Sequence, residues 1–486
     1  MIYIQSKIKI LLILVYFFSS NCYATIDTLW SRTFGTNHFE GLREVKQTSD
    51  GGFIMVGEQL NVNSDPCVIF VVKVDSSGNE EWSRSFGGYS YDVPYTISLT
   101  RDKGYIIGGE TTSFEQGGIF VLRLNNSGDS LWMTILGNAS FDHLTSKSSI
   151  IETIEEEILI AGWGWRPPNK NEILLYKLDS FGNPIWEKSY GGNIDDEFSS
   201  SIQPVESGGC LIAGFTYSFG NGRCDGYLIR ITNDGDTLWT RTYGRDSYDS
   251  FKFAREISFG DLVAVGSTQS FGNQEQGFIV KTDSLGNEKW SIAIGDSLND
   301  NLMDVCVFSE NQFIVTGYTN SVITSNKEDA YLVQLDENGK ISDQLIFGGA
   351  GSDFINDIEK ISDDILMAGG STESWGNGSM DFWLICLQLD SLDLNTELPN
   401  IPILLQNYPN PFNNGTTISF ELPKSSFVTI ILFDILGNEV QQICNDLFES
   451  GVQSINFHTK NLSSGVYFYQ MRVDTYKETR KLVLLK

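Results

Sequence analysis

The sequence has 486 residues, 41% of them hydrophobic, and its 33 Lys and Arg against 62 Asp and Glu give a formal net charge of −29. That length is too great for one small core and suits a large repeat domain with an appendage. So strong a negative charge, with no basic face, argues against binding to nucleic acid or to an anionic membrane surface.

Residues 1–24 have the pattern of a secretory signal peptide. A positive start and an apolar run over 8–18 precede Cys22-Tyr23-Ala24, which suits a cleavage site. The run is too short to span a membrane as a helix, and no later stretch reaches the required length. We therefore expect an exported chain without a transmembrane helix. The alternative at this end of the chain is that Cys22 is a lipoprotein cysteine.

One pattern then recurs over residues 25–390. Each copy has an apolar strand end, a turn containing Gly and a Trp that opens the next strand, as in LDSFGNPIWEKSYGG at 178–192. The anchors are Trp30, Trp82, Trp132, Trp186, Trp239, Trp290 and, with Asp in place of Trp, Asp343, so successive spacings are 52, 50, 54, 53, 51 and 53 residues. A period of about 50 residues is typical of a solenoid or a propeller.

Each repeat holds four short runs rich in β-branched and aromatic residues and bounded by turn formers. In the second repeat these runs are 81–87, 92–99, 105–110 and 119–124. No segment has a sustained helical period. Four antiparallel strands per repeat match one blade, so the sequence predicts an all-β, seven-bladed β-propeller. A linear β-solenoid is the alternative.

The ends of the repeat region predict how the ring closes. The first copy begins directly at its Trp strand, and the last repeat stops at 381–389 without one. Residues 28–35 should therefore supply the outer strand of the seventh blade, since an open ring would leave unpaired sheet edges. The Trp side chains should pack between neighbouring blades, with the Gly four residues earlier permitting the turn.

These Trp repeats resemble the tryptophan-docking motif of quinoprotein-type propellers, and the whole region resembles propeller repeats of exported bacterial cargo. The resemblance implies shared packing. It implies neither a quinone cofactor nor a particular activity.

An acidic residue stands ten positions after every anchor. In a propeller this position lies where the chain enters the innermost strand, so the carboxylates would ring one mouth of the central channel. They are Glu40, Asp92, Asp142, Asp196, Asp249, Asp300 and Asp353. Bare carboxylates ~8 Å apart would repel by roughly 2 kcal/mol per pair. Either backbone N–H groups of the adjacent loop compensate them, or a cation does, for which oxygen ligands favour calcium.

Loops on the same face carry aromatic residues, including Trp375. Trp163 and Trp165, in AGWGWRPPNK, break the repeat, and Arg166 adds a lone positive charge. We expect this loop to contact a glycan or protein ligand first, unless the aromatic residues simply pack on the neighbouring blade.

No catalytic residue stands out, because every acid that can be singled out belongs to the repeat register. The chain has only three His residues, and the six Cys after the signal are scattered, so we expect buried thiols and name no metal site. Calcium is the one cofactor that the acids bring into question. The predicted function is an exported binding or structural module. The alternative is a secreted hydrolase acting on polysaccharide or glycoprotein.

Residues 391–405 read as a linker, and residues 406–486 lose the period. Strands alternating with Pro, Gly and Asn turns suit a small Ig-like β-sandwich. Several separated motifs stand in this segment, in order: Asn407, Tyr408, Pro409, Asn410, Pro411 and Phe412; 434–437 (DILG); Gly465, Val466 and Tyr467; and KLVLLK from Lys481 to Lys486.

With these motifs the segment resembles the type A C-terminal sorting domain of the type IX secretion system of Bacteroidetes-type bacteria. The resemblance implies that the domain meets the type IX secretion machinery and directs the chain across the outer membrane. The protein would then be secreted or anchored at the outer-membrane cell surface.

Overall fold

The computed structural model describes residues 26–60, 67–114, 117–137, 142–144, 146–167, 170–192, 197–257, 260–272, 274–295, 299–309, 312–320 and 327–389 of the larger unit. In the C-terminal unit it describes residues 403–404, 412, 415–422, 424–435, 437–449, 451–459, 462–473 and 476–484. The chain divides into two compact units at residues 391 and 392, and each is described by itself. The predicted signal peptide lies outside the described residues.

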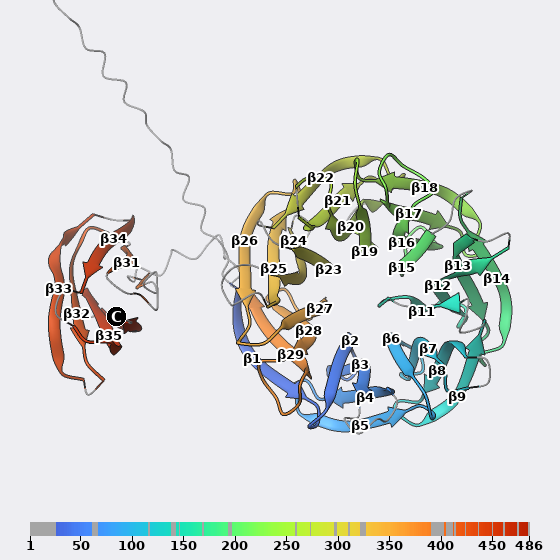
Figure 1. The fold of residues 1–486 in the computed structure, drawn as a ribbon, viewed down its shortest axis with the longest axis horizontal. Coiled ribbons are helices and arrows are strands. Elements are labelled where there is room, and N and C mark those ends of the chain that lie inside the picture. Colours follow the sequence, from blue (N-terminus) through green and yellow to red (C-terminus); the bar gives the residue numbers. More distant parts are fainter. Residues whose placement is uncertain are drawn as a thin grey trace, which may run out of the picture. The chain divides into compact units, whose positions relative to one another are not determined.

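In the larger unit the described strands form seven sheets arranged around a central channel (Figure 1). Blade 1 contains β2 (Phe39–Gln47), β3 (Phe53–Leu60), β4 (Val68–Val74) and β5 (Glu80–Phe86), and blade 2 contains β6 (Asp92–Leu99), β7 (Tyr105–Thr111), β8 (Gly118–Leu124) and β9 (Ser130–Leu136). Blade 3 contains β10 (Asp142–His143), β11 (Ile150–Glu152), β12 (Ile158–Arg166), β13 (Lys170–Leu178) and β14 (Pro184–Tyr190). Blade 4 contains β15 (Glu197–Pro204), β16 (Cys210–Thr216), β17 (Asp225–Ile231) and β18 (Thr237–Tyr243).

Blade 5 contains β19 (Asp249–Glu256), β20 (Leu262–Thr268), β21 (Gln276–Thr282) and β22 (Glu288–Ile294), and blade 6 contains β23 (Asp300–Ser309), β24 (Gln312–Thr319), β25 (Asp329–Asp336) and β26 (Ile341–Phe347). Blade 7 contains β27 (Asp353–Lys360), β28 (Ile365–Thr372), β29 (Asp381–Leu389) and β1 (Ile26–Phe34). The predicted seven-bladed propeller is confirmed, and so is the predicted position of the Trp strand as the outermost strand of a blade.

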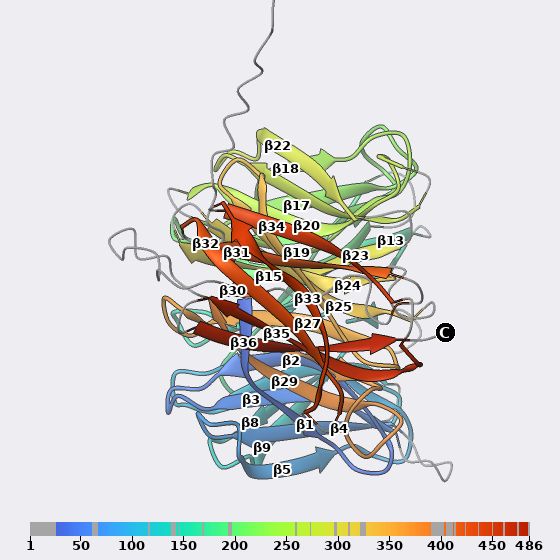
Figure 2. The ribbon, with the colours of Figure 1, turned by 90° about the vertical axis from the view of Figure 1, so that its left-hand side faces the viewer.

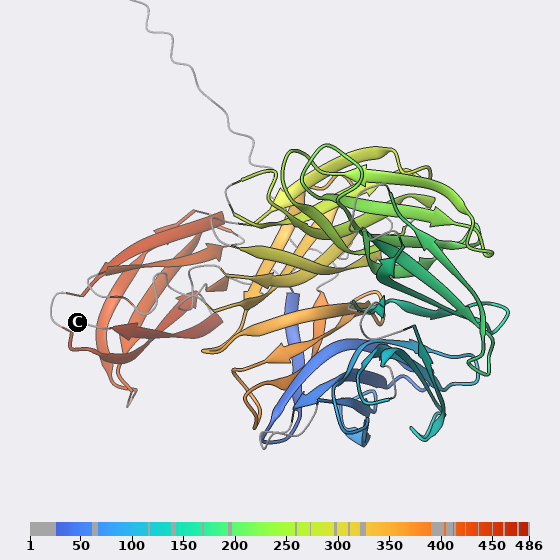
Figure 3. The same cartoon turned by 45° about the vertical axis from the view of Figure 1, so that its right-hand side comes forward.

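The middle two strands of each blade are buried on both faces, which is why they read as nearly continuous apolar runs. β4 (VIFVVKV) and β8 (GIFVLRL) are examples, with every residue of β8 buried. Their side chains form layers between adjacent blades. One such layer packs Ile54, Val56, Ile69 and Val71 of blade 1 against Ile107, Phe120 and Leu122 of blade 2. The tilt of the strands between the two faces of the ring is visible in Figure 3.

The ring closes as predicted, with β1 beside β29 at the outer edge of blade 7 (Figure 1). The pairing runs from Ile26 opposite Leu389 to Phe34 opposite Phe382, with one irregularity after Thr28. A side-chain bond reinforces it, because Trp383 Nε1 donates to Ser31 Oγ at 2.7 Å.

Each anchor Trp packs on the turn glycine of the next blade. An added Cβ at Gly128 would lie 2.8 Å from the ring of Trp82, and one at Gly78 would lie 2.8 Å from that of Trp30. Both glycines have a positive φ, near +80°, which a side chain would disfavour for a second reason. The same contact recurs for Trp132 on Gly182, Trp186 on Gly235, Trp239 on Gly286 and Trp290 on Gly339. The predicted packing of Trp between blades is confirmed.

Blade 3 departs from the repeat at the channel. Its innermost strand is split into β10 and β11, both paired with β12. Between them the described residues Ser146 to Ser149 form no strand, and Ser148 has a positive φ of 53°. We call residues 146–149 the blade 3 crosspiece.

The C-terminal unit is a β-sandwich, as predicted, and its strands are labelled in Figure 2. One sheet contains β30 (Ile403–Leu404), β31 (Gly415–Leu422) and β34 (Gly451–His458), and the other contains β33 (Glu439–Phe448), β32 (Ser426–Phe433), β35 (Gly465–Val473) and β36 (Tyr476–Leu484). The two sheets enclose one core that includes Phe420, Ile430 and Tyr469. Since β30 lies within 391–405, the end of the predicted linker belongs to this unit.

Three of the C-terminal motifs come together in the sandwich. The N–H of Phe412, which is buried, donates to the Val483 carbonyl oxygen at 3.0 Å. β35 and β36 pair so that Gly465 lies opposite Leu484, Val466 opposite Val483 and Phe468 opposite Lys481. The Tyr467 hydroxyl donates to the Ser463 carbonyl oxygen at 3.0 Å. Asn407, Tyr408, Pro409, Asn410, Pro411 and Lys486 lie outside the described residues.

The six cysteines of the described residues are free thiols, and all but Cys444 are buried. Burial raises the pKa of Cys67, Cys210 and Cys306 to about 12. No helix long and apolar enough to cross a bilayer occurs among the residues that the structure describes.

Deleting residues 26–34 should open the ring, because β29 then loses its partner and Gly78 loses the ring of Trp30. Loss of a fully buried Trp side chain costs ~3–5 kcal/mol; Trp30 is partly buried and contributes less. The deletion also removes the pairing of β1 with β29, so urea unfolding should shift to a clearly lower midpoint. A synthetic peptide of residues 26–35 should restore the midpoint, and a scrambled peptide should not. An unchanged midpoint after the deletion would contradict the closure.

Candidate functional site

The described acids of the predicted ring lie where the chain enters the innermost strand of each blade, and their side chains are buried. The carboxylate of Asp92 accepts hydrogen bonds from Thr111 Oγ1, from Ser113 Oγ at 2.6 Å and from the Gly88 N–H at 2.7 Å. The same kinds of partner surround Asp249 (Thr268, Ser270 and the N–H of Arg245) and Asp353 (Thr372, Ser374 and the N–H of Gly349).

The backbone of these acids also ties each blade to the one before it. The Asp92 N–H donates to the Cys67 carbonyl oxygen at 2.9 Å, and at the ring junction the Glu40 N–H donates to the Met380 carbonyl oxygen at 2.8 Å. Equivalent bonds join Asp249 to Cys224, Asp300 to Glu275 and Asp353 to Glu328. The acids therefore hold loops and blades together.

In blade 4 the repeat position is shifted by one residue. The ladder places Glu197 opposite Thr216, as it places Asp92 opposite Thr111. One extra residue before β15 explains the shift, so Glu197 rather than the predicted Asp196 occupies the position. Asp196 itself lies outside the described residues.

These contacts favour the first of the two expected ways of compensating the acids, by groups of the adjacent loop rather than by a cation. The acids form a circle in the backbone, but hydroxyl and N–H groups of the blade edge and its entry loop engage Asp92, Asp249 and Asp353. This is the kind of compensation that turn-forming carboxylates use. Within the described residues, no group of three or more His, Cys, Asp or Glu is placed to hold a metal ion.

The segment with Trp163, Trp165 and Arg166, predicted as a loop, is the end of strand β12, and here a cation replaces the usual hydroxyls. Asp142 lies opposite Gly164, which has no side chain to offer, and the guanidinium of Arg166 binds its carboxylate at 2.6 Å. Arg166 also reaches Glu187 and the Tyr176 hydroxyl. The lone positive charge predicted for this segment therefore stabilises the blade.

The three Trp residues predicted to contact a ligand differ in their exposure and in their neighbours. Trp165 is 36% exposed, and Trp375 is 46% exposed with its ring 5.0 Å from that of Trp383 in its own blade. Trp163 is half-buried and lies between two other rings, His143 at 4.3 Å and Phe198 at 4.6 Å.

Trp163 belongs to a continuous row of rings across the mouth of blades 3 and 4. Phe198 stacks on Phe215 at 4.8 Å, and Phe215 contacts Tyr217, which is 39% exposed, at 6.1 Å. We call this row, made of His143, Trp163, Phe198, Phe215 and Tyr217, the aromatic belt. Two other rows of ring contacts cross between blades, Tyr243–Phe251–Phe278–Phe271 and Phe347–Trp383–Trp375, but they run through buried rings, whereas every ring of the belt is half-buried or exposed.

Polar groups extend the belt toward blade 1. His143 Nδ1 lies 3.1 Å from Glu110 Oε1, and the hydrogen bond and charge of Glu110 raise the pKa of His143. Burial, together with the charge of Glu110, raises the pKa of Tyr95 to about 12. Arg43 lies 5.1 Å from the Tyr95 ring and pairs with Glu58 at 2.6 Å. The belt thus has apolar rings at one end and hydrogen-bonding groups at the other.

Inside the channel a second set of polar side chains links the innermost strands. A β-bulge interrupts each innermost strand of blades 1, 2, 4, 5, 6 and 7 at the same place. In four of these blades the side chain after the bulge accepts a hydrogen bond from the next blade: Asp304 from the Ile358 N–H, Asp357 from the Val45 N–H, Glu44 from the Ile97 N–H and Thr96 from the Ser149 N–H. A bulge re-aims the side chain beside it.

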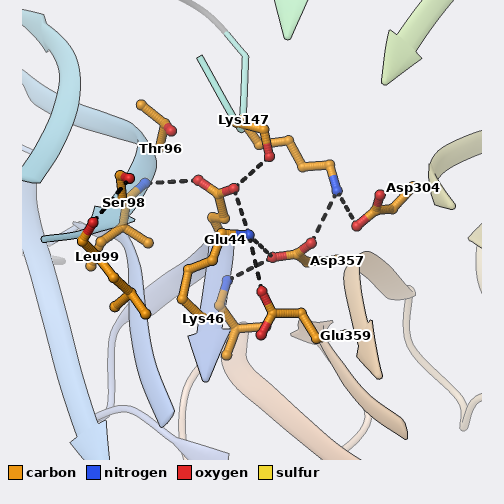
Figure 4. Close-up of polar contacts among 12 residues, drawn as sticks. Glu44, Lys46, Thr96, Ser98, Leu99, Lys147, Asp304, Asp357 and Glu359 are labelled. Carbon is orange, nitrogen blue, oxygen red and sulfur yellow. Dashed lines mark hydrogen bonds and ion pairs between the residues drawn. The ribbon is translucent and has the colours of Figure 1, made fainter. Parts of the chain in front are cut away.

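Two lysines neutralise the carboxylates of this set (Figure 4). The ammonium of Lys147, on the blade 3 crosspiece, lies 2.8 Å from Asp304 and 3.3 Å from Asp357. Lys46 lies 3.0 Å from Glu44, 3.4 Å from Asp357 and 3.4 Å from Glu359. We call these residues the channel charge cluster.

Burial and charge act in opposite directions on these groups. Burial raises the pKa of Asp304 more than Lys147 lowers it. Burial also favours the neutral form of Asp357, but Lys147 and Lys46 outweigh burial and lower its pKa. The carboxylates Asp357, Glu44 and Glu359 likewise outweigh burial at Lys46 and raise its pKa. A cavity of about 250 Å³ remains beside the cluster.

The sequence contained a pattern from which part of this cluster could have been predicted. Glu44, Asp304 and Asp357 each stand four residues after an acid of the predicted ring, so a second register was visible. No such pattern pointed to Lys147, because the innermost strand of blade 3 is split and Lys147 therefore has no equivalent position in the other repeats.

Replacing Lys147 with Met should leave Asp304 and Asp357 buried without their shared cation. Removing one partner of a buried pair costs ~3–5 kcal/mol. The pKa values of both carboxylates should rise in the folded variant, which then keeps protons that the unfolded chain releases above about pH 4. Its stability should therefore fall relative to wild type as the pH rises from about 4 to 8, and urea unfolding across this range measures the difference. Lys340→Met, at an exposed position, is the control, and an equal effect of both substitutions would refute the role of Lys147.

The sequence of residues 406–485 matches the family model described as the secretion system C-terminal sorting domain. No match to the chain was found among curated proteins.

Some solved structures resemble the chain at low identity and low TM-score. A Dyadobacter fermentans protein of unknown function is 12% identical, with a TM-score of 0.45, over 75% of this chain and 99% of that one. PorZ, a surface component of the type-IX secretion system of Porphyromonas gingivalis, is 14% identical, with a TM-score of 0.40, over 93% of this chain and 60% of that one. A quinoprotein alcohol dehydrogenase-like protein of Bacteroides thetaiotaomicron is 14% identical, with a TM-score of 0.38, over 65% of this chain and 67% of that one.

The family match indicates where the protein is delivered. Residues 406–485 form a secretion system C-terminal sorting domain, and the chain is an exported propeller protein that is secreted or attached at the cell surface.

Proposed function

We propose that this exported propeller is a binding module and that its ligand, a glycan, lies on the aromatic belt. The observation that carries the proposal is the belt itself. At the mouths of blades 3 and 4 five rings in successive contact are all half-buried or exposed, whereas the ring rows between blades 4 and 5 and between blades 6 and 7 run through buried side chains.

Half-exposed rings beside polar groups suit a sugar. The faces of a sugar ring are apolar and pack on aromatic side chains, while its hydroxyls need donors and acceptors placed around them. Glu110 and His143 supply such groups at one end of the belt. The predicted contact of the Trp163 segment with a ligand is part of this proposal, and Trp163 is its central ring.

The hydrolase alternative has less support. Glycoside hydrolysis needs two carboxyl groups that face the substrate. Asp92, Asp249 and Asp353 are buried and engaged by hydroxyl and N–H groups, and Asp304 and Asp357 are paired with Lys147. We propose no resident cofactor, and the binding test below includes calcium because the sequence brought it into question.

The sorting domain provides the route to the site of action. We propose that it engages the type IX secretion machinery directly. The clustering of Phe412 with β35 and β36 supports this, because it gathers three separated motifs on one part of the sandwich.

Deleting residues 406–486 should keep the propeller inside the cell envelope. Cell fractionation and immunoblotting should find the shortened protein in the periplasm and the full chain on the surface or in the medium. The control is Thr479→Ala, an exposed change on β36, which should leave export intact. Surface delivery of the shortened protein would show that residues 406–486 are not needed for export.

Trp163→Ala should weaken glycan binding at least tenfold, since one ring contact of about 1.4 kcal/mol corresponds to that factor. A glycan array with the purified mature protein, with and without calcium, identifies the ligand, and calorimetry measures the change. Trp375→Ala, on blade 7, is the control and should bind like wild type. Loss of binding at Trp375 alone would move the site to blade 7, and release of soluble sugars from a polymer would favour the hydrolase.

A further inference from the structure

A cavity of about 230 Å³ opens at the end of the aromatic belt, between blades 4 and 5. Three rings line it: Phe215 and Tyr217, which belong to the belt, and Tyr248, which is 39% exposed. Pockets for drug-sized ligands measure about 300–1,000 Å³. This cavity therefore has room for one sugar-sized group at the end of a longer ligand.

The cationic group of the cavity is Lys252, and two acidic residues, Asp249 and Glu275, line it as well. Lys252 is the extra residue of the β-bulge in β19, between Phe251 and Phe253. A bulged residue leaves the ladder, which here turns the lysine toward the cavity that it lines. Among the described residues no carboxylate forms an ion pair with it, although the charge of Glu275 acts on it from across the cavity.

Lys252 has a nearby carboxylate but no ion pair among the described residues. One oxygen of Glu275 accepts a hydrogen bond from Asn301 Nδ2 at 3.2 Å. Burial lowers the pKa of Lys252 more than Glu275 raises it. Two further cations lie over nearby rings, Arg223 at 5.9 Å from Tyr248 and Arg245 at 4.1 Å from Phe271. The carboxylate of Asp249 is engaged by the hydroxyls of Thr268 and Ser270 and by the Arg245 N–H, which leaves Glu275 as the acidic group nearest in effect to Lys252.

We propose that this cavity holds an acidic sugar, a pyranose ring that bears a carboxylate, as one residue of the glycan on the belt. The carboxylate pairs with the Lys252 ammonium. The ring packs against Phe215, Tyr217 and Tyr248, and the exposed Gln269 and the hydroxyl of Ser250 hydrogen-bond its hydroxyl groups. The inference rests on the proposed glycan binding and specifies the class of glycan.

In a half-buried site the protonated Lys252 favours a negatively charged ligand over a neutral one. A carboxylate gains most from a cation that has no other partner, because neither group has to give up an existing ion pair. A neutral sugar of the same shape gains only the ring contacts. The cavity should therefore discriminate between an acid and its neutral ester.

The experiment compares trigalacturonate with its methyl ester, which has the same rings without the charge. Calorimetry with the full mature protein should show at least tenfold tighter binding of the acid at low salt. Lys252→Met should abolish this difference and leave binding of the ester unchanged. Lys252→Arg, which keeps the charge, should retain preference for the acid, and thermal unfolding should confirm that both variants fold.

The outcomes separate this inference from the proposed function. Equal binding of acid and ester by wild type, or an unchanged preference in Lys252→Met, overturns the acidic-sugar site while a positive glycan array leaves the belt in place. If no glycan binds in any arm, the proposed function fails as well. Benzoate serves as a carboxylate without a sugar, and tight binding of benzoate without trigalacturonate would overturn the assignment to a saccharide.

Discussion

The contact between an indole ring and a glycine of the next sheet is the interaction on which the larger unit depends. Each blade is a small sheet with two faces to bury, and only its neighbours can cover them. A Trp at the outer edge reaches across to a turn where no side chain fits, as Trp82 does on Gly128. The glycine is thus fixed twice, by its positive φ and by the ring above it. The exception follows from the same rule. Asp343 stands where the seventh Trp would be, and its neighbour, blade 7, has no hairpin turn between its outer strands because β29 and β1 come from opposite ends of the repeat region.

Much of the fold could be predicted from the sequence, because the period fixes blade number and the missing Trp strand fixes the junction. The predicted runs 92–99 and 119–124 match β6 and β8 within one residue. The site was harder, for physical reasons. Counting residues could not reveal the inserted residue that puts Glu197 in place of Asp196. Whether a carboxylate faces water or a hydroxyl depends on the loop that folds over it, and Asp92 is covered by Ser113 from a loop 21 residues away. Lys147 enters the channel only because its strand is broken.

Blade 3 differs most from the repeat, and it contributes residues to both the channel charge cluster and the aromatic belt. Its crosspiece places Lys147 in the channel, and its strand β12 places Trp163 in the belt. The two features have different roles. The channel charge cluster satisfies buried carboxylates that the bulges turn inward, so it stabilises the ring from the centre. The belt leaves its rings half-covered, which a structural contact would not require. A repeat protein gains a specific surface in this way, by keeping most units alike and changing one.

The buried cysteines have a consequence for how this exported chain matures. A thiol with a pKa near 12, such as that of Cys67 or Cys210, holds almost no thiolate at neutral pH, and thiolate is the form that oxidants and other thiols attack. Once folded, the propeller is thus chemically quiet in an oxidising compartment and acquires no covalent cross-links there. In the unfolded chain these thiols are open to oxidants, so their burial in the folded blades is what protects them.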